Sequence, residues 1–331
     1  MIDAAVCRLD IGELVAFPTE TVYGLGADAC NPKAVARIYK AKNRPVTHPV
    51  IVHLAPGDDP GNWARSIGLE AQRLIDAFWP GPLTLILKRA ITITNEVSGG
   101  QDSIGLRCPS HPVAQALLRA FSDLRNGHGS VAAPSANKFG YVSPTIAQHV
   151  RDEFGDSVYL LDGGACDIGI ESTIIDLSRG FPALLRLGRI TPQQITDVLG
   201  IVPLLPSNSG TATPRSSGTL KAHYATRTPI ALLSLEEILN EVETYSPHNR
   251  LAVIARDGSP QVDVLRVRPN LWFLAAPNDP YMYEYELYRM LRKLDSSNIL
   301  CIFIELLPAT PEWSAINDRL QRAEAAFKIN S

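Results

Sequence analysis

The segment 39–53, YKAKNRPVTHPVIVH, gathers cations and histidines between a helical pattern and a buried strand. Its positively charged and imidazole residues are Lys40, Lys42, Arg44, His48 and His53. Cations at the C-terminus of a helix offset the helix dipole, which accounts for Lys40. The dipole does not account for Arg44, which a proline follows, or for two histidines around an otherwise apolar strand. Rigidly placed cations of this kind suit a polyphosphate or a carboxylate.

Two further arginines, Arg107 and Arg186, stand at the ends of predicted strands. A single arginine at a strand end is usually part of a surface salt bridge. However, ligands of open α/β sheets bind outside the carboxyl ends of the strands. We therefore expect Arg44, Arg107 and Arg186 to converge on one edge of a sheet, where together they would suit a triphosphate.

The segment 17–28, FPTETVYGLGAD, combines hydroxyl groups with glycines. It carries Thr19, Glu20, Thr21 and Tyr23, and then Gly24-Leu25-Gly26. We expect a tight glycine turn that joins a strand to a helix. The segment lacks the third glycine of a dinucleotide fingerprint. Hydroxyls beside glycines nevertheless let a ligand approach the backbone closely, so a binding role stays open beside the simple turn.

Two later segments have a similar character. Residues 132–145 place hydroxyl and amide groups around Gly140, at Ser135, Asn137 and Ser143. Residues 161–173 offer Asp162, Gly163, Gly164, Glu171 and Ser172. Small residues and hydroxyls next to backbone turns can hydrogen-bond to phosphate or ribose. Each segment taken alone is equally compatible with an ordinary loop.

Several common catalytic signatures are missing from the sequence. It contains no GxxxxGKS/T phosphate loop, no HExxH motif, no GxSxG elbow and no kinase HRD set. Its five cysteines are scattered, and none forms a CxxC pair. This pattern argues against a zinc ribbon and against a disulfide framework. We therefore expect neither an ordinary P-loop ATPase nor a serine hydrolase.

Length and charge bound the function further. With 331 residues, the chain exceeds what one compact core usually holds, so we expect two domains. Its 31 basic and 34 acidic residues give a formal net charge of −3, so tight binding of a polynucleotide through its phosphates is not the first expectation. The N-terminus lacks the apolar core of a signal peptide. Apolar runs are far shorter than the ~20 residues that span a bilayer, and we expect a cytoplasmic location without a membrane partner.

Alternating apolar runs and amphipathic stretches in the first 200 residues predict an α/β domain with a central twisted sheet. The predicted strands are Leu14–Phe17, Val50–His53, Leu83–Lys88, Ser103–Arg107, Ser130–Ala133, Val158–Leu161, Ser172–Leu177 and Ala183–Leu187. The predicted helices span 32–42, 69–79, 111–121 and 144–154. Asn31 and Pro32 supply an N-cap and a first-turn proline for the first helix. Ser143-Pro144 opens the last.

Residues 201–228 are rich in Pro, Ser, Gly and Thr and predict a long irregular connection. A plain spacer rarely needs the cluster Lys221, His223 and Tyr224, so this segment could enter a binding site. Gly210 and Gly218 would supply its bends. Beyond it, the strands Ile230–Leu233, Arg250–Ile254, Leu271–Leu274 and Ile299–Ile304 alternate with helical patterns at 234–245, 279–294 and 313–327. The predicted organisation is a domain at 1–200, a linker at 201–228 and a smaller α/β domain at 229–331.

The chain resembles the YrdC-like family in its long, two-domain form. The matching strings run in family order: PTETVYGLGADA (18–29), KNRPVTHPVIVH (42–53), FWPGPLTLIL (78–87), SIGLRCPSHP (103–112), AAPSANKFGYVSPT (132–145), LDGG (161–164), GIESTIIDL (169–177) and LLRLG (184–188). The linker with His223-Tyr224 and the ending TPEWSAINDRLQRAEAA (310–326) match the long form. Three linker positions depart from the family pattern, where Pro, Met and Pro are common: Ser217, Thr219 and Thr226.

This resemblance implies a fold and a site. The fold would be a strongly twisted mixed sheet with flanking helices, followed by a second, smaller Rossmann-like α/β domain. L-threonine would be surrounded by Thr21, His53, Arg107, Ala133 and Ser172. ATP would be surrounded by Arg44, His48, Ser103, Ser135, Ser143, Arg186 and Tyr224, with Lys42 helping to hold the phosphates. The linker would fold over the pocket as a lid.

The resemblance also implies an activity, the synthesis of L-threonylcarbamoyladenylate from L-threonine, bicarbonate or CO2, and ATP, with release of pyrophosphate. The product would pass to a tRNA threonylcarbamoyl-transfer complex acting on tRNAs that read codons beginning with A, with at most a weak contact between this protein and tRNA. An anion attacks a polyanion in this chemistry, so catalysis would come from orientation and from the fixed charges of Lys42, Arg44 and Arg107. Mg²⁺ would be held mainly by the ATP phosphates, and we expect no metal ligands from protein side chains.

Two other functions stay open on the residues alone. An RNA-binding module with the same fold would use the concave surface of the sheet, and ATP-dependent release of pyrophosphate distinguishes the enzyme from it. A carbamoyl-transfer relative serving hydrogenase maturation would embed this domain in a longer chain with zinc-finger-like cysteine pairs, which this sequence lacks.

Overall fold

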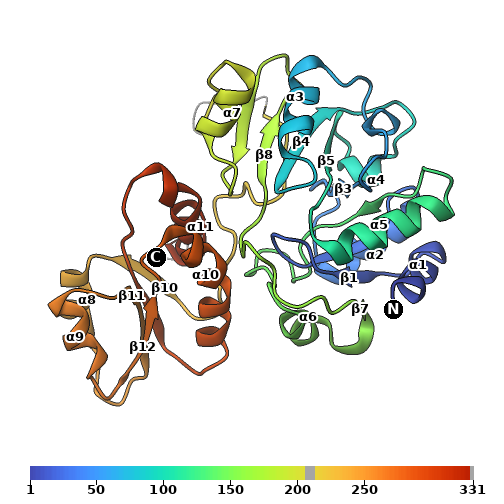
Figure 1. The fold of residues 1–331 in the computed structure, drawn as a ribbon. Coiled ribbons are helices and arrows are strands. Elements are labelled where there is room, and N and C mark those ends of the chain that lie inside the picture. Colours follow the sequence, from blue (N-terminus) through green and yellow to red (C-terminus); the bar gives the residue numbers. More distant parts are fainter. Residues whose placement is uncertain (206–212, 329–331) are drawn as a thin grey trace. The chain divides into compact units, whose positions relative to one another are not determined.

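The computed structural model describes residues 1–205 and 213–328, which fall into two compact units (Figure 1). The first unit comprises residues 1–139 and 143–219, and the second comprises residues 140–142 and the chain from Leu220 onward. The division after Thr219 falls within the predicted linker. Gly210, one of the two expected hinge glycines, lies outside the described residues. Within the described ranges, no helix combines the length and apolar character that crossing a bilayer requires.

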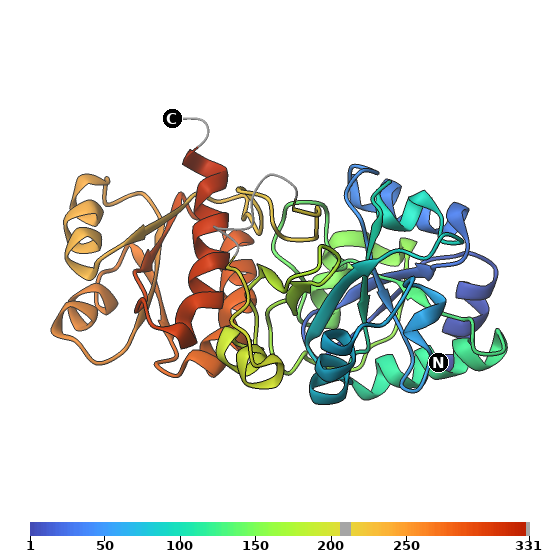
Figure 2. The ribbon, with the colours of Figure 1, turned by 90° about the horizontal axis from the view of Figure 1, so that it is seen from above.

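A nine-stranded mixed sheet forms the centre of the first unit, in the order β7-β1-β2-β6-β3-β5-β4-β8-β9. Its strands are β1 (Val15–Phe17), β2 (Gly24–Asp28), β3 (Ile51–His53), β4 (Leu83–Lys88), β5 (Ser103–Arg107), β6 (Val131–Ala132), β7 (Tyr159–Leu160), β8 (Thr173–Asp176) and β9 (Ala183–Arg186). β3 pairs in parallel with β5, whereas β4 is antiparallel to β5 and parallel to β8. Seen from above, the blue N-terminal strands lie at a steep angle to the teal ones (Figure 2). The predicted mixed, strongly twisted sheet is confirmed.

Helices cover this sheet through apolar side chains. They are α1 (Ile2–Asp10), α2 (Pro32–Lys42), α3 (Leu69–Phe78), α4 (Asn95–Ser98), α5 (Pro112–Leu124), α6 (Ala147–Phe154) and α7 (Pro192–Leu199), with short 3-10 turns at η1 (Pro60–Asn62) and η2 (Gly155–Ser157). One apolar cluster joins α2, α3 and α7 to β4 and β5, and another joins α1 and α5 to β1. α2 begins as predicted, because the Asn31 side chain accepts hydrogen bonds from the N–H groups of Lys33 and Ala34.

The start of α6 was predicted wrongly. The helix begins at Ala147 and not at Ser143-Pro144. Ser143 does not cap it, because its hydroxyl donates a hydrogen bond to Glu171 Oε1 at 2.6 Å. A side chain that the sequence placed at a helix start is therefore part of a buried polar contact.

The glycine turn predicted at Gly24–Gly26 is also wrong, since these residues belong to strand β2. β2 pairs antiparallel with β1, with Val15 opposite Gly26. A Cβ atom at position 26 would lie 2.7 Å from Val131 Cγ1 and 2.8 Å from Phe17 Cε1. Glycine is needed here for close packing between neighbouring strands and not for a turn. The turn comes before β2, where the Thr19 N–H donates to the Val22 carbonyl.

The second unit contains a smaller parallel sheet in the order β10-β13-β11-β12. Its strands are β10 (Ile230–Leu233), β11 (Leu251–Arg256), β12 (Leu271–Ala276) and β13 (Cys301–Glu305). Its helices are α8 (Leu235–Thr244), α9 (Pro260–Arg266), α10 (Pro280–Asp295) and α11 (Ser314–Lys328), with a 3-10 turn at η4 (Pro311–Trp313). A second α/β fold is therefore confirmed. β12 stands at one end of the strand order, with Arg266 lying over the Phe273 ring and Lys293 over the Trp272 ring.

Candidate active site

The polar residues of β3 and β5 share one face of the first sheet. Side chains alternate between the two faces of a strand. Ile104 and Leu106 enter the apolar cluster with α2 and α3, so Ser103 and Arg107 lie on the opposite face. His53 stands directly opposite Arg107 in the parallel β3–β5 ladder and therefore belongs to the same face.

A β-bulge brings Arg186 to this face. In the β8–β9 pairing, Ile175 faces Leu184 but Ile174 faces Arg186, so Leu185 is the extra residue. Without the bulge, Arg186 would point to the same side as Leu184, which packs in the cluster with α2 and α3. Bulges commonly re-aim a side chain beside a functional site. Here the bulge directs a buried arginine to the polar face.

Arg107 is 4% exposed and lies in a network of buried hydrogen bonds. Its Nη2 atom forms an ion pair with Glu20 Oε1 at 2.6 Å, and Nη1 donates to Thr21 Oγ1 at 2.9 Å. Its Nε atom donates to the Gly81 carbonyl at 3.3 Å. The alternative of a surface salt bridge at this strand end is therefore wrong.

His53 is uncharged at neutral pH. Burial, and then the positive charge of Arg107, lower the pKa of His53 to about 3. Phe17 packs against its ring edge to face, with the ring centroids 6.1 Å apart. The imidazole beside Arg107 can therefore exchange hydrogen bonds with a substrate without adding a second positive charge.

Arg44 and Arg186 meet through one residue of the predicted linker. Arg44 Nη2 donates to the Ser217 hydroxyl at 3.1 Å, and Arg186 Nη1 donates to the Ser217 carbonyl at 3.0 Å. Burial, and to a smaller extent the nearby Arg186, lower the pKa of Arg44 to about 10, so it stays charged at neutral pH. Ser217, whose hydroxyl accepts the hydrogen bond from Arg44, is one of the linker positions that depart from the family pattern.

The expectation that three arginines converge on one sheet edge needs a correction. β5 and β9 run in the same direction, so Arg107 and Arg186 end at the same edge of the sheet. Arg44 does not, because it lies in the loop that leads into β3, where its side chain donates to the carbonyls of His48 and Pro49. It approaches Arg186 through Ser217.

Lys42 links the end of α2 to the loop after β6. Its Nζ atom donates to the Ser135 carbonyl at 2.5 Å and also to the Asn137 carbonyl. Ser135 in turn forms an isolated β-bridge with Gly24. Lys42 thus connects segment 39–53 with segment 132–145, and Ser135 connects the latter with segment 17–28.

The other predicted residues of the first unit lie around these groups. Ser172 Oγ is 2.8 Å from Thr84 Oγ1 and accepts a hydrogen bond from Arg186 Nη2 at 3.0 Å. The Ala133 N–H donates to the Ile51 carbonyl at 2.9 Å. The His48 ring contacts the Phe139 ring edge to face, with the centroids 5.3 Å apart. Burial lowers the pKa of His48, and the charges of Arg44 and Arg215 lower it further.

Tyr224 belongs to the second unit. It is 1% exposed, stacks on Tyr288 at 5.9 Å between ring centroids, and lies under the guanidinium of Arg319 at 5.0 Å. Its φ of 60° is unusual for a bulky residue and marks a strained or functional position. Its predicted place beside ATP stays a prediction.

Three residues outside the predicted set take part in these networks: Glu20, Glu171 and Ser217. Glu20 and Glu171 stand inside the quoted motifs, so the signal was present in the sequence. Their roles were not visible, because Glu20 meets Arg107 across 87 positions of the chain and Ser143 meets Glu171 across 28. Within residues 1–205 and 213–328, no group of three or more His, Cys, Asp or Glu residues is placed to hold a metal ion.

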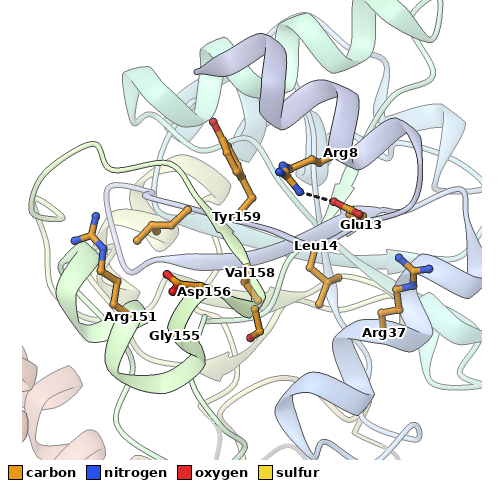
Figure 3. Close-up of a pocket in the computed structure, with 11 residues that line it drawn as sticks. Arg8, Glu13, Leu14, Arg37, Arg151, Gly155, Asp156, Val158 and Tyr159 are labelled. Atoms are coloured by element: carbon orange, nitrogen blue, oxygen red, sulfur yellow. Dashed lines mark hydrogen bonds and ion pairs between the residues drawn. The ribbon is translucent and has the colours of Figure 1, made fainter.

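A pocket of about 540 Å³ lies elsewhere in the first unit, beside β7 at one end of the sheet order (Figure 3). Arginines at positions 8, 37 and 151 surround it, together with Glu13 and Asp156. Arg8 and Glu13 form an ion pair at 2.6 Å, but both side chains are more than 40% exposed, so the pair adds little stability. None of the predicted site residues lines this pocket, and we assign it no part in the reaction.

Comparisons with known proteins agree with the two-unit organisation. A family model for Sua5, YciO and YrdC, described as Telomere recombination, matches residues 8–188. A second model, described as Threonylcarbamoyl-AMP synthase, C-terminal domain, matches residues 190–325.

Individual relatives carry the same name. The threonylcarbamoyl-AMP synthase of Bacillus subtilis is 37% identical over 331 residues, covering 96% of this chain and 91% of that protein. The one from Pyrococcus abyssi is 42% identical over 217 residues, covering 65% of this chain and 62% of that protein. Among solved structures, P. abyssi Sua5 complexed with L-threonine superposes with a TM-score of 0.86 at 32% identity, covering 98% of this chain and 94% of that chain.

Proposed function

The chain belongs to the two-domain threonylcarbamoyl-AMP synthase family, and from this membership we propose that it makes L-threonylcarbamoyladenylate from L-threonine, bicarbonate or CO2, and ATP. The observation that carries the proposal is the arrangement of two polar clusters on one sheet. One consists of Arg107 with Thr21, His53 and the neighbouring Glu20, and the other of Arg44 and Arg186. The first suits an amino acid, and the second suits a polyphosphate.

In the first step, the amine of threonine attacks the carbon of CO2. A C–N bond forms, the nitrogen releases a proton, and the product is a carbamate. Arg107 offers N–H groups to the threonine carboxylate, and the uncharged His53 beside it hydrogen-bonds without competing for that carboxylate. These side chains orient the amino acid, and orientation alone can supply a large part of a rate enhancement.

In the second step, a carbamate oxygen attacks the α-phosphorus of ATP. A new P–O bond forms, the bond to the bridging oxygen breaks, and pyrophosphate leaves. Both partners are anionic, so their repulsion must be offset by fixed positive charge. Lys42, Arg44 and Arg186 supply that charge from buried positions, where it is screened less than in water. Ser135 and Ser143 would add neutral hydrogen bonds to the nucleotide.

Mg²⁺ enters this scheme with the nucleotide, bound chiefly through its phosphates. Mg²⁺ keeps several waters and usually takes few protein ligands. The cation-rich surroundings of Arg44 and Arg186 suit an anionic Mg–ATP complex better than a bare metal ion. The ion would draw charge away from the phosphates as the pyrophosphate leaves.

The predicted lid fits this chemistry. The segment Thr213–Thr219 lies on the first unit, where Arg215 donates to the carbonyls of Thr47 and Gly99. Ser217 of the same segment accepts hydrogen bonds from Arg44 and Arg186, the two arginines proposed to bind the phosphates of ATP. A closed segment would exclude water, which otherwise hydrolyses the carbamate and the mixed anhydride. The assignment of Tyr224 to ATP rests on the family resemblance alone.

The product is a reactive anhydride and needs an acceptor. We propose that it passes to a tRNA threonylcarbamoyl-transfer complex, and that this protein itself contacts tRNA weakly at most, in keeping with its net charge of −3. We propose that the reaction takes place in the cytoplasm.

The decisive experiment measures pyrophosphate release by the full chain with each substrate left out in turn. Release should require ATP, L-threonine, bicarbonate and Mg²⁺ together, and mass spectrometry should detect the threonylcarbamoyl adenylate. Equal release of pyrophosphate without threonine would identify a simple ATP pyrophosphatase and overturn the proposal. A protein that binds RNA but releases no pyrophosphate would support the RNA-binding alternative instead.

A further inference from the structure

We infer that Glu20 is a positioning residue for the amino-acid substrate, acting through Arg107, an inference that rests on the proposed function. Glu20 is 3% exposed, and both of its carboxylate oxygens are engaged. Oε1 pairs with Arg107 Nη2 at 2.6 Å, and Oε2 accepts the N–H of Ser110 at 3.1 Å. The carboxylate therefore ties the end of β5 to the chain that follows it.

The backbone that carries Glu20 is held on several sides. Thr19 Oγ1 accepts hydrogen bonds from the N–H groups of Thr21 and Val22, which closes the turn around Glu20. The Glu20 carbonyl accepts the N–H of Ile168 at 2.8 Å. This fixed backbone lets Glu20 define the position of a long arginine side chain.

The contacts of Arg107 leave a defined part of its guanidinium for a ligand. A guanidinium has about five N–H donors in one plane. Glu20, Thr21 and the Gly81 carbonyl each take one donor, and they come from different segments of the chain. Within the described residues these are its hydrogen-bond partners, so two donors remain. A substrate carboxylate can meet Arg107 only in the orientation that those two donors allow.

Glu20 also sets the charge of this subsite. The positive charge of Arg107 and the negative charge of Glu20 cancel, and His53 is uncharged. These three side chains together are therefore neutral. A zwitterionic amino acid is neutral as well, whereas the triphosphate of ATP is strongly anionic. Glu20 thus gives the amino-acid subsite a balanced charge, which suits a zwitterion better than a triphosphate.

The test substitutes Glu20 and measures threonine binding directly. Glu20→Gln keeps the shape but has only one acceptor oxygen, so its amide would turn an N–H toward either Arg107 or Ser110. We expect calorimetry to show threonine affinity weakened about 10–100-fold, the loss for a hydrogen bond to a charged group. The KM for threonine should rise by a similar factor, while the KM for ATP changes less than about threefold. Glu20→Asp retains the negative charge but has a shorter side chain. Its threonine affinity should lie between that of the wild type and that of Glu20→Gln.

A matched control separates positioning from stability. Asp176 is another buried carboxylate of the first unit, paired with Arg179 Nε at 2.6 Å and accepting the N–H of Ser178. Asp176→Asn should lower the melting temperature and leave the Kd for threonine unchanged. If Glu20→Gln, or Glu20→Asp where the first variant does not fold, binds threonine like the wild type, Glu20 serves only the fold. A wild-type protein that does not bind threonine would overturn the inference too.

Binding and turnover also distinguish the inference from the function beneath it. Threonine binding by the wild type without threonine-dependent pyrophosphate release would refute the proposed function, while a weaker Kd in Glu20→Gln would still uphold the role of Glu20.

Discussion

The main-chain oxygen of Ser217 accepts a hydrogen bond from Arg186 at 3.0 Å. The same residue binds Arg44 through its hydroxyl, so the segment rests on the two cations proposed for ATP. We expect ATP with threonine to hold the segment more firmly and to slow tryptic cleavage after Arg215 and Lys221 at least threefold. Cleavage after Arg250, in the loop before β11, provides the internal reference. Equal rates with and without the ligands would mean that the segment is a passive spacer.

Replacing Arg107 should harm the reaction strongly. Arg107→Ala leaves Glu20 buried without its cation. We expect kcat/KM for threonine to fall by an amount that corresponds to a loss of ~2–5 kcal/mol of transition-state stabilisation. Arg107→Lys should not restore it, since an ammonium group cannot reach three acceptors in one plane. Steady-state kinetics on folded variants test this, with circular dichroism as the check on folding. Near-normal turnover in folded Arg107→Ala would show that this arginine is not used.

His53 should make the protein less stable in mild acid. Its pKa is about 3 in the folded state and 6.5 when solvated, so the unfolded chain binds the proton first as the pH falls. The stability contributed by the neutral imidazole is complete above pH 6.5 and lost progressively below it, by about 2 kcal/mol at pH 5. Urea unfolding at pH 7.5 and pH 5 should therefore show a smaller pH effect in His53→Gln than in the wild type. His128→Gln, at an exposed position, should keep the wild-type difference.

Gly26 should tolerate no side chain. An alanine there would place its Cβ 2.7 Å from Val131 and 2.8 Å from Phe17, in the middle of the sheet. Overpacking of this kind costs about 1–3 kcal/mol, which should lower the urea midpoint of the first unit. At Gly68 a Cβ would have Glu70 at 3.8 Å as its near neighbour, so Gly68→Ala provides the control and should change stability by less than ~1 kcal/mol. Similar midpoints for both variants would contradict the packing argument.

Local patterns in the sequence were sufficient for most of the fold. Asn31-Pro32 marks the start of α2, and the apolar run at 230–233 coincides with β10. Such signals lie within a few residues of the element they define. β2 was missed because its two glycines also fit a turn, and only the side chains of Phe17 and Val131 reveal why glycine is required.

The contacts within the candidate site were harder to predict, because they join residues that lie far apart in the sequence. Arg107 was recognisable as a strand-end arginine, but its partner Glu20 stands 87 positions away, and no periodicity connects them. The direction of Arg186 depends on a one-residue bulge, which a run of apolar residues does not reveal. The pairing of Arg44 with Arg186 depends on Ser217, a linker residue that departs from the family pattern and for which the sequence predicted no contact. Residue types could be predicted locally, whereas their pairings follow from the folded topology.

The edge strand β12 affects how the second unit behaves at high concentration. An edge strand with apolar side chains can recruit a strand from another molecule. In β12, the rings of Trp272 and Phe273 are only partly buried, and Lys293 and Arg266 stand over them. Two molecules approaching edge to edge would bring these positive charges together, and the repulsion opposes aggregation. This protection fades as salt shortens the Debye length to about 3 Å at 1 M, so low ionic strength favours the dispersed protein in purification and storage.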